Sequence, residues 1–381
     1  MSRYAQPSPV DRHVDSNKGL ALQPSALTSV PWRAVITFVI LACALAWLVV
    51  LPLWLGGAGL RSPLTGILIP LMMFTPLVSV LVVMFFVQKP RPRPLPEFLG
   101  LWPLRPLKRT IWVTVLAIVG SALIVVAGVF LAAGLGLVHL DLTHFSGFAA
   151  TLKAVTAGNE VPIGSIPIGL IVLLQLVIIP AAAVINGVLT IGEELGWRGY
   201  LLPSLRPLGT WPALLISGAV WGLWHSPIIL LGYNFAQPNL FGVAMMMGGC
   251  ILYGVLLGWL RLRTASIWPS VLAHGAFNAT AGFLFLVIAA NTTADPVATG
   301  PLGWVTWIVM ALVIIVLIAT RQFSKQPRLQ RRSVQPKQAL PLRATPERFA
   351  KNSNDANKHR LSPKRAQRRS SSREPSPTPS Q

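Results

Sequence analysis

The sequence predicts an all-α membrane protein that crosses the bilayer about eight times, and three observations predict this class. Of its 381 residues, 53% are hydrophobic and only 11% are charged, whereas soluble proteins carry about 25% charged residues. The mean hydropathy is +0.61. The apolar residues are gathered in blocks long enough to cross a bilayer as helices, for which about 20 residues suffice. Lipid offers the backbone no hydrogen-bond partners, and the alternating pattern of a β-barrel is absent, so the blocks are expected to be helical.

Eight apolar blocks are the expected spans. The fourth to seventh contain Gly, Pro or polar residues, so their ends are the least sharply defined by composition. Pairs of glycines four residues apart recur in this region and predict close helix–helix contacts. The blocks cover residues 34–55, 64–87, 110–138, 164–190, 211–231, 240–260, 266–290 and 302–320.

The net charge is +21, and the basic residues are distributed in the pattern that membrane topology predicts. Sixteen of the 32 Lys and Arg residues follow Thr320, and most of the others lie in alternate loops. Of the four remaining loops, two carry one Lys or Arg residue each and two carry none. By the positive-inside rule, this pattern predicts a multi-pass cell-membrane protein with both termini in the cytoplasm.

The chain is expected to have three parts. Residues 1–33 are a polar cytoplasmic segment, 34–320 form the membrane domain, and 321–381 form a basic, disordered tail with too few apolar residues to bury a core. The tail is expected to be a solvated extension, and contact with anionic lipid headgroups is the alternative. No specific nucleic-acid partner is expected, because aromatic residues do not interleave with the basic ones. Both cysteines lie in apolar spans, so neither a disulfide nor a cysteine metal site is expected.

Three polar clusters interrupt the apolar background, and they carry the candidate site. Glu193 and Glu194 are the only acidic residues in or beside the spans, and Arg198 follows them. The fifth span contains Trp221 and His225, and the seventh contains His274 and Asn278. Ionisable groups within a membrane are costly, about 2.5–3.5 kcal/mol for a carboxylate at a helix centre by the lower estimates, and usually functional. Three such clusters on separate helices predict one shared site.

Helical spacing assigns different partners to the two glutamates. Residues four apart share a helix face, so Glu194 is expected to pair with Arg198. Glu193 then points in another direction and is free for chemistry. The span boundaries place Glu193 near the cytoplasmic end of its span, yet His225 lies ~14 residues, about 20 Å, into the next. For the two to meet, residues 199–210 are expected to re-enter the membrane or run along its surface.

Two chemistries fit these residues. In the first, Glu193 is the general base for a water molecule that His225 polarises, and His274 and Asn278 donate hydrogen bonds to an oxyanion. No cofactor is required. In the second, Zn²⁺ is bound by His225, His274 and Glu193 and activates the water. The helical HExxH zinc motif is absent.

The three clusters resemble the motifs EExxxR, FxxxH and HxxxN of the CAAX prenyl endopeptidase and bacteriocin-processing family (CPBP or Abi) of intramembrane proteases. The match covers about residues 164–290, and Trp221 replaces the usual Phe. The motifs read Glu193-Glu194-Leu195-Gly196-Trp197-Arg198, Trp221-Gly222-Leu223-Trp224-His225 and His274-Gly275-Ala276-Phe277-Asn278.

The resemblance implies a CAAX-type endopeptidase that cleaves a prenylated, leader or other membrane-associated peptide. With Glu193 near the cytoplasmic end of its span, cleavage is expected near the cytoplasmic side. It implies catalytic roles for Glu193, His225, His274 and Asn278 and supporting roles for Glu194, Arg198 and Trp221. The family was long described as metalloproteases, and the motifs leave metal dependence open. Two other functions also remain: a non-catalytic scaffold or bacteriocin-immunity protein on the same fold, and a proton-coupled transporter, for which no internal repeat is detected.

Overall fold

The computed structural model describes residues 27–102, 104, 106–156 and 166–324. The predicted tail from residue 325 onward and residues 1–26 of the N-terminal segment lie outside this described part. The chain divides into two units, Met1–Arg332 and Ser333–Gln381, and all described residues belong to the first. They form helices and no strand, which confirms the all-α prediction.

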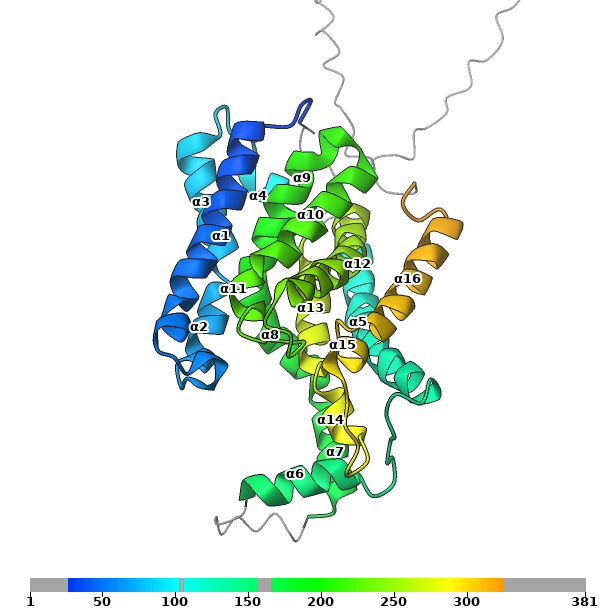
Figure 1. Cartoon of the computed structure of the whole chain (residues 1–381). Coiled ribbons are helices and arrows are strands. Elements are labelled where there is room, and N and C mark those ends of the chain that lie inside the picture. The colour runs from blue at the N-terminus through cyan, green and yellow to red at the C-terminus, as the bar shows by residue number, and fades with distance from the viewer. Residues whose placement is uncertain (1–26, 103, 105, 157–165, 325–381) are drawn as a thin grey trace, which may run out of the picture. The chain divides into compact units, whose positions relative to one another are not determined.

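The helices are arranged as a bundle around a buried centre (Figure 1). Two π-helical stretches, Val83–Val87 and Leu195–Leu201, continue α3 and α8, and short 3-10 turns occur at Gly59–Arg61 and Arg206–Leu208. The α-helices are α1 Trp32–Leu55, α2 Thr65–Met72, α3 Thr75–Val82, α4 Leu95–Leu99, α5 Leu107–Gly134, α6 Ser146–Thr156, α7 Ile168–Val177, α8 Ile179–Glu194, α9 Leu202–Leu205, α10 Thr210–Trp224, α11 Ser226–Ile229, α12 Leu240–Thr264, α13 Trp268–Thr280, α14 Phe283–Val287, α15 Pro296–Thr299 and α16 Trp304–Ala319.

Six helical stretches of the described chain are long and apolar enough to cross a membrane. A seventh is counted if α7 and the helical stretch Ile179–Leu208, bent by 50° relative to each other, form one span. The bend falls where Pro180 opens α8, because proline lacks the N–H that a continuous helix needs. These findings confirm a multi-pass membrane protein.

The expected span 211–231 is not among these helices, so at most seven of the eight expected spans are found in the described residues. Helix α10 has 15 residues and ends at Trp224, which gives it a length of about 22 Å. Pro227 then opens the four-residue α11, and a loop follows. Apolar composition alone did not reveal that this block is broken in the middle.

The expected end of the fourth span at Thr190 is also wrong, and its correction brings the polar clusters together. Helical structure continues from α8 through the π-helical stretch and α9 to Leu208, and Gly209 makes the turn into α10. Gly209 lies 16 residues after Glu193 and 16 residues before His225. In an antiparallel helical hairpin, this symmetry puts both side chains at one depth, about 24 Å from the turn. No re-entrant segment is needed.

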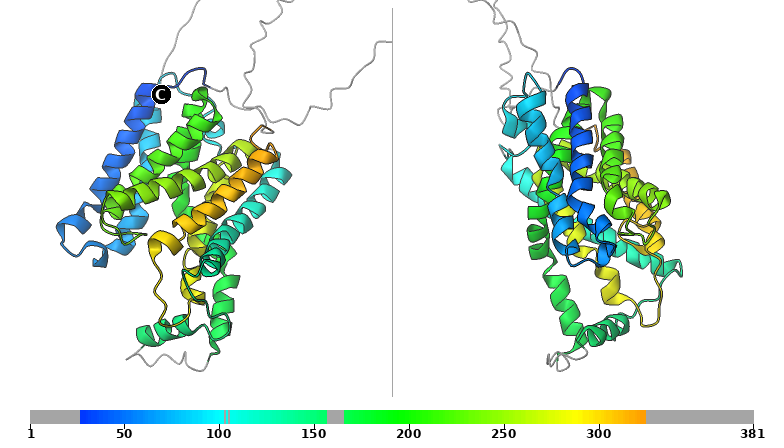
Figure 2. Two further views of the ribbon diagram at one scale, coloured as in Figure 1. Left: turned by 45° about the vertical axis from the view of Figure 1, so that its right-hand side comes forward. Right: turned by 60° about the vertical axis from the view of Figure 1, so that its left-hand side comes forward.

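Close packing holds α10 against α12. A Cβ atom added at Gly218 would lie 2.7 Å from the Cα of Ile251, and one at Gly222 would clash with the Cα of Met247. The predicted small-residue contact is therefore confirmed for this pair of helices. On the neighbouring flank, α16 packs against α5 and α12 (Figure 2).

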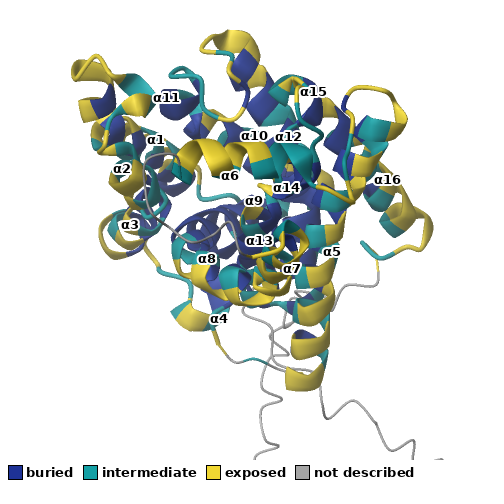
Figure 3. Cartoon of the chain, turned by 90° about the horizontal axis from the view of Figure 1, so that it is seen from below, coloured by how far each residue is buried: buried dark blue, intermediate teal, exposed yellow. Residues whose placement is uncertain are grey.

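Burial separates a polar centre from an apolar outer surface. Seen from below, α8 and α13 contain many of the buried residues, and the exposed residues lie on the outer faces of the surrounding helices (Figure 3). Many of these exposed side chains are large and apolar, including Ile40, Leu48 and Leu116. Such a surface is the one that a lipid environment requires.

Candidate active site

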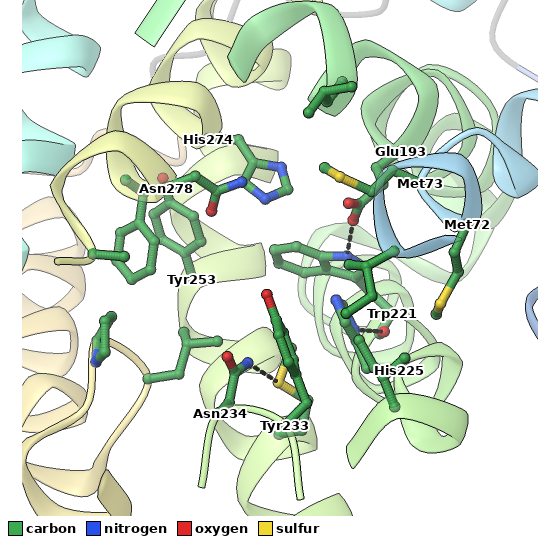
Figure 4. Close-up of a pocket in the computed structure, with 18 of the residues that line it drawn as sticks. Met72, Met73, Glu193, Trp221, His225, Tyr233, Asn234, Tyr253, His274 and Asn278 are labelled. Atoms are coloured by element: carbon green, nitrogen blue, oxygen red, sulfur yellow. Dashed lines mark hydrogen bonds between the residues drawn. The ribbon is translucent and has the colours of Figure 1, made fainter. Parts of the chain in front are cut away.

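The three predicted polar clusters line one cavity of about 360 Å³. Glu193 comes from α8 and Trp221 from α10, and His225 directly follows α10. His274 and Asn278 come from α13 (Figure 4). The structure thus brings together all four residues predicted to be catalytic. Four of these five side chains are buried, and Asn278 is exposed.

Glu193 is held by the aromatic residue of the second motif. The indole Nε1–H of Trp221 donates a hydrogen bond of 2.7 Å to Oε2 of Glu193. Both side chains are 2% exposed. Phenylalanine, the usual residue at this position of the motif, has no such donor. The departure from the family pattern therefore has a structural consequence in this chain.

Glu194 has the separate, structural environment that helical spacing predicted. Nη1 of Arg198 donates to Oε1 of Glu194 at 2.8 Å, which confirms the expected pair. Nδ1 of His274 lies 3.0 Å from the same oxygen. The guanidinium group of Arg198 also lies over the Trp221 ring, 4.2 Å from its centroid. These contacts connect the first motif to the second and the third.

The partners of the two histidines define which nitrogen atoms remain for chemistry. Nδ1 of His225 is 2.8 Å from the carbonyl oxygen of Trp221. A carbonyl only accepts, so Nδ1 carries the proton, and Nε2 of the neutral ring is an acceptor. The ionised carboxylate of Glu194 likewise accepts from Nδ1 of His274. Nε2 of His274 can donate as well when the ring carries both protons, and Glu194 then supplies the counter-charge.

Two tyrosines belong to the surroundings of the site and were missed in the sequence. Tyr233, from the loop between α11 and α12, has its hydroxyl directed into the cavity (Figure 4). Burial, and secondarily the nearby Glu193 charge, raises the pKa of this phenol, so it remains a hydrogen-bond donor at neutral pH. Tyr253 donates to the carbonyl oxygen of Ala273 at 2.9 Å, and its ring stacks on Phe277. The chain has only four tyrosines, and this rarity is the one feature of the sequence that could have drawn attention to these two residues.

The arrangement does not fit the alternative zinc site. Among the residues that the structure describes, no three His, Cys, Asp or Glu side chains are grouped so that they could hold a metal ion. No chemical step is therefore assigned to a metal.

Fold and site together define a multi-pass, all-α membrane protein with carboxylates and histidines gathered in a cavity within its helical bundle. Residues 167–280 match the family described as type II CAAX prenyl endopeptidase Rce1-like. The CAAX prenyl protease 2 of Methanococcus maripaludis is 29% identical over 124 residues, which cover 27% of this chain and 45% of that protein. The chain thus spans less than half of the length of this curated relative.

The matched segment contains all three motifs from Glu193 to Asn278. The resemblance predicted from the sequence, to the CAAX prenyl endopeptidase and bacteriocin-processing family, is confirmed by this match over residues 167–280.

Proposed function

We propose that the protein is an intramembrane endopeptidase that hydrolyses a peptide bond of a membrane-associated substrate. The observation that carries this proposal is the convergence of Glu193, His225, His274 and Asn278 on one cavity. The family match and the name of the archaeal relative support the same activity. A prenylated peptide and a leader peptide are the two substrate classes to compare.

Glu193 and His225 form the water-activating half of the proposed mechanism. The acceptor Nε2 of His225 orients a water molecule, and Glu193 removes a proton from it as the hydroxide adds to the carbonyl carbon of the scissile bond. Glu193 then passes this proton to the leaving amine, so atoms and charges balance over the cycle. The Trp221 hydrogen bond fixes Oε2 and leaves the other oxygen, Oε1, for the proton transfer.

His274 and Asn278 form the half that stabilises the oxyanion. They lie four residues apart on α13 and both line the cavity. Hydrogen-bond donors at such a position stabilise the charge that develops on the carbonyl oxygen in the transition state. The Glu194–Arg198 pair holds His274 in place from behind. Each half thus has a positioning contact from another motif.

The activity is tested with purified protein reconstituted in lipid and given prenylated and leader peptides. The wild-type chain is expected to cleave at least one class, and His274→Ala is expected not to. Equal cleavage by both proteins would contradict the proposal. Absence of cleavage would favour the scaffold or immunity function. Loss of cleavage with chelator, restored by Zn²⁺, would establish the metal mechanism instead.

Replacing Asn278 by aspartate is expected to lower kcat by about 10²–10³-fold, because the change keeps the side-chain shape but removes the donor. KM should change little, since the contact is strongest in the transition state. Steady-state kinetics of the reconstituted enzyme measure this. A variant with wild-type kcat would remove Asn278 from the oxyanion site.

Replacing Trp221 by phenylalanine is expected to lower kcat about tenfold and leave KM unchanged. The variant removes one hydrogen bond to a charged group, worth about 1.5–3 kcal/mol, and keeps an aromatic ring. Trp268→Phe is the matched control. It also removes an indole hydrogen bond, the 3.2 Å bond to the carbonyl of Leu101, but at a residue that does not line the cavity. Equal kcat values for the two variants would show that Trp221 does not position Glu193.

A further inference from the structure

The two ends of the bundle differ in charge. One end holds the start of α1, the α9–α10 turn and the end of α16, at the top of Figure 1. It also carries the basic segment before α4 with Lys89, Arg91 and Arg93. We call it the basic end. In the described loops of the opposite end, with α6 at the bottom of Figure 1, the only Lys or Arg residues are Arg61 and Lys153.

The cavity extends from the catalytic residues toward the end that lacks basic loops. Residues 233–235, between α11 and α12, and 300–302, between α15 and α16, form part of its lining. No described residue of the basic segment 88–102 or of the turn 206–209 lines it. Asn234 and Asn278, which both line the cavity, are exposed.

Toward the basic end, the cavity is closed by packed aromatic side chains. Trp197 and Tyr200 are fully buried, and the ring of Phe38 lies 5.5 Å and 5.0 Å from their rings. Trp224 continues the layer, with its ring 5.9 Å from that of Trp197.

A second layer lies behind the aromatic one. The buried guanidinium of Arg261 donates to the carbonyl oxygens of Arg198 and Phe98 at 3.2 Å and 2.8 Å. On this side, packed and hydrogen-bonded residues therefore lie behind the cavity, whereas loop residues line its other side.

We propose that the substrate enters from the end opposite the basic loops, which the positive-inside rule places outside the cytoplasm. The substrate class is then a peptide segment of an exported or membrane-anchored protein, presented at the extracytoplasmic surface. This replaces the cytoplasmic side expected from the span boundaries. The substrate assignment rests on the proposed protease function, whereas the direction of entry does not.

Cysteine accessibility tests the direction of entry without any need for activity. The two native cysteines, Cys43 and Cys250, are first replaced by alanine. Single cysteines are then introduced by Ala281→Cys in the cavity lining, by Thr293→Cys at the exposed loop of the same end, and by Lys89→Cys at the basic end. Right-side-out membrane vesicles are treated with a membrane-impermeant maleimide, before and after permeabilisation. The full-length chain is used throughout.

The expected result is labelling of the Ala281→Cys and Thr293→Cys variants in sealed vesicles, and of the Lys89→Cys variant only after permeabilisation. Labelling of Lys89→Cys in sealed vesicles would overturn the orientation. If the Ala281→Cys variant is labelled only under the conditions that label Lys89→Cys, or only in detergent, entry from this end is overturned. Labelling of the Thr293→Cys variant shows that the loop at this end is folded and accessible.

Peptide added to sealed vesicles supplies the second readout, with the Cys43, Cys250 double-alanine chain as the enzyme. Cleavage in right-side-out but not in inside-out vesicles is expected. Cleavage only in inside-out vesicles would overturn the proposed substrate class while supporting the protease. Accessible Ala281→Cys without cleavage on either side would instead count against the protease function and overturn the substrate class that rests on it.

Discussion

Replacing Glu193 by glutamine is expected to lower kcat toward the upper end of the about 10²–10⁴-fold range that general-base catalysis contributes. Glutamine keeps the side-chain volume and an oxygen that accepts from Trp221, but it cannot take a proton from water. KM should stay near the wild-type value, because the oxygen that contacts Trp221 is retained. Steady-state and single-turnover kinetics of reconstituted protein measure both constants.

The matched control is Glu97→Gln, in the first turn of α4, which is not part of the cavity lining. It removes one carboxylate from the same chain and should leave kcat unchanged. Glu193→Gln with wild-type turnover would exclude Glu193 as the base and direct attention to His225 or to a non-enzymatic function.

Replacing Glu194 by glutamine is expected to destabilise the folded protein by about 3–5 kcal/mol, the cost of leaving a buried ion without its partner. Glu194 is 0% exposed and Arg198 only 2%, so no water replaces the lost charge. Inactivation of the purified protein in detergent, followed against temperature or denaturant, measures the loss. Activity should fall as well, since His274 loses the acceptor of its Nδ1–H.

The double variant Glu194→Gln, Arg198→Met separates charge from shape. Removal of both ions should restore most of the stability, because a buried pair replaced by uncharged groups of similar volume is often neutral. If the single variant is as stable as the wild type, the pair is not the internal support of the site. If the double variant is no more stable than the single one, the lost contact with His274 accounts for the effect.

The sequence predicted which residues meet in the cavity better than it predicted the helices that carry them. The cost of burying a charge marked both glutamates, and helical spacing assigned different roles to Glu193 and Glu194. The hydrogen bond between Arg198 and Glu194 confirms the spacing argument. The same charges misplaced the end of the fourth span. An ion pair satisfied inside the bundle does not stop a helix in the way that an exposed charge in lipid does. All residues from Gly192 to Leu202 are buried, although the polar ones suggested a loop.

Other features depend on contacts between distant parts of the chain and leave little trace in the pattern. The 15-residue α10 is apolar enough to suggest a full span, and only Pro227 marks where it is interrupted. Tyr233 lies in an expected loop outside the membrane, yet the fold turns its hydroxyl into the cavity. The hydrogen bond from Trp221 to Glu193 joins residues 28 apart in the chain, and the sequence showed only that an aromatic residue differs from the family pattern.

The sharing of one Glu194 oxygen between Arg198 and His274 also has a consequence for biosynthesis. His274 follows Glu194 by 80 residues, so α8 is synthesised well before α13 and meets the membrane with a carboxylate that only Arg198 can neutralise. A charged residue at the bilayer centre costs about 2.5–3.5 kcal/mol on insertion. Lateral release of α8 into lipid is therefore expected to wait for the later helices. In this protein, the charges that form the site also set the order in which the nascent chain can leave the insertion machinery.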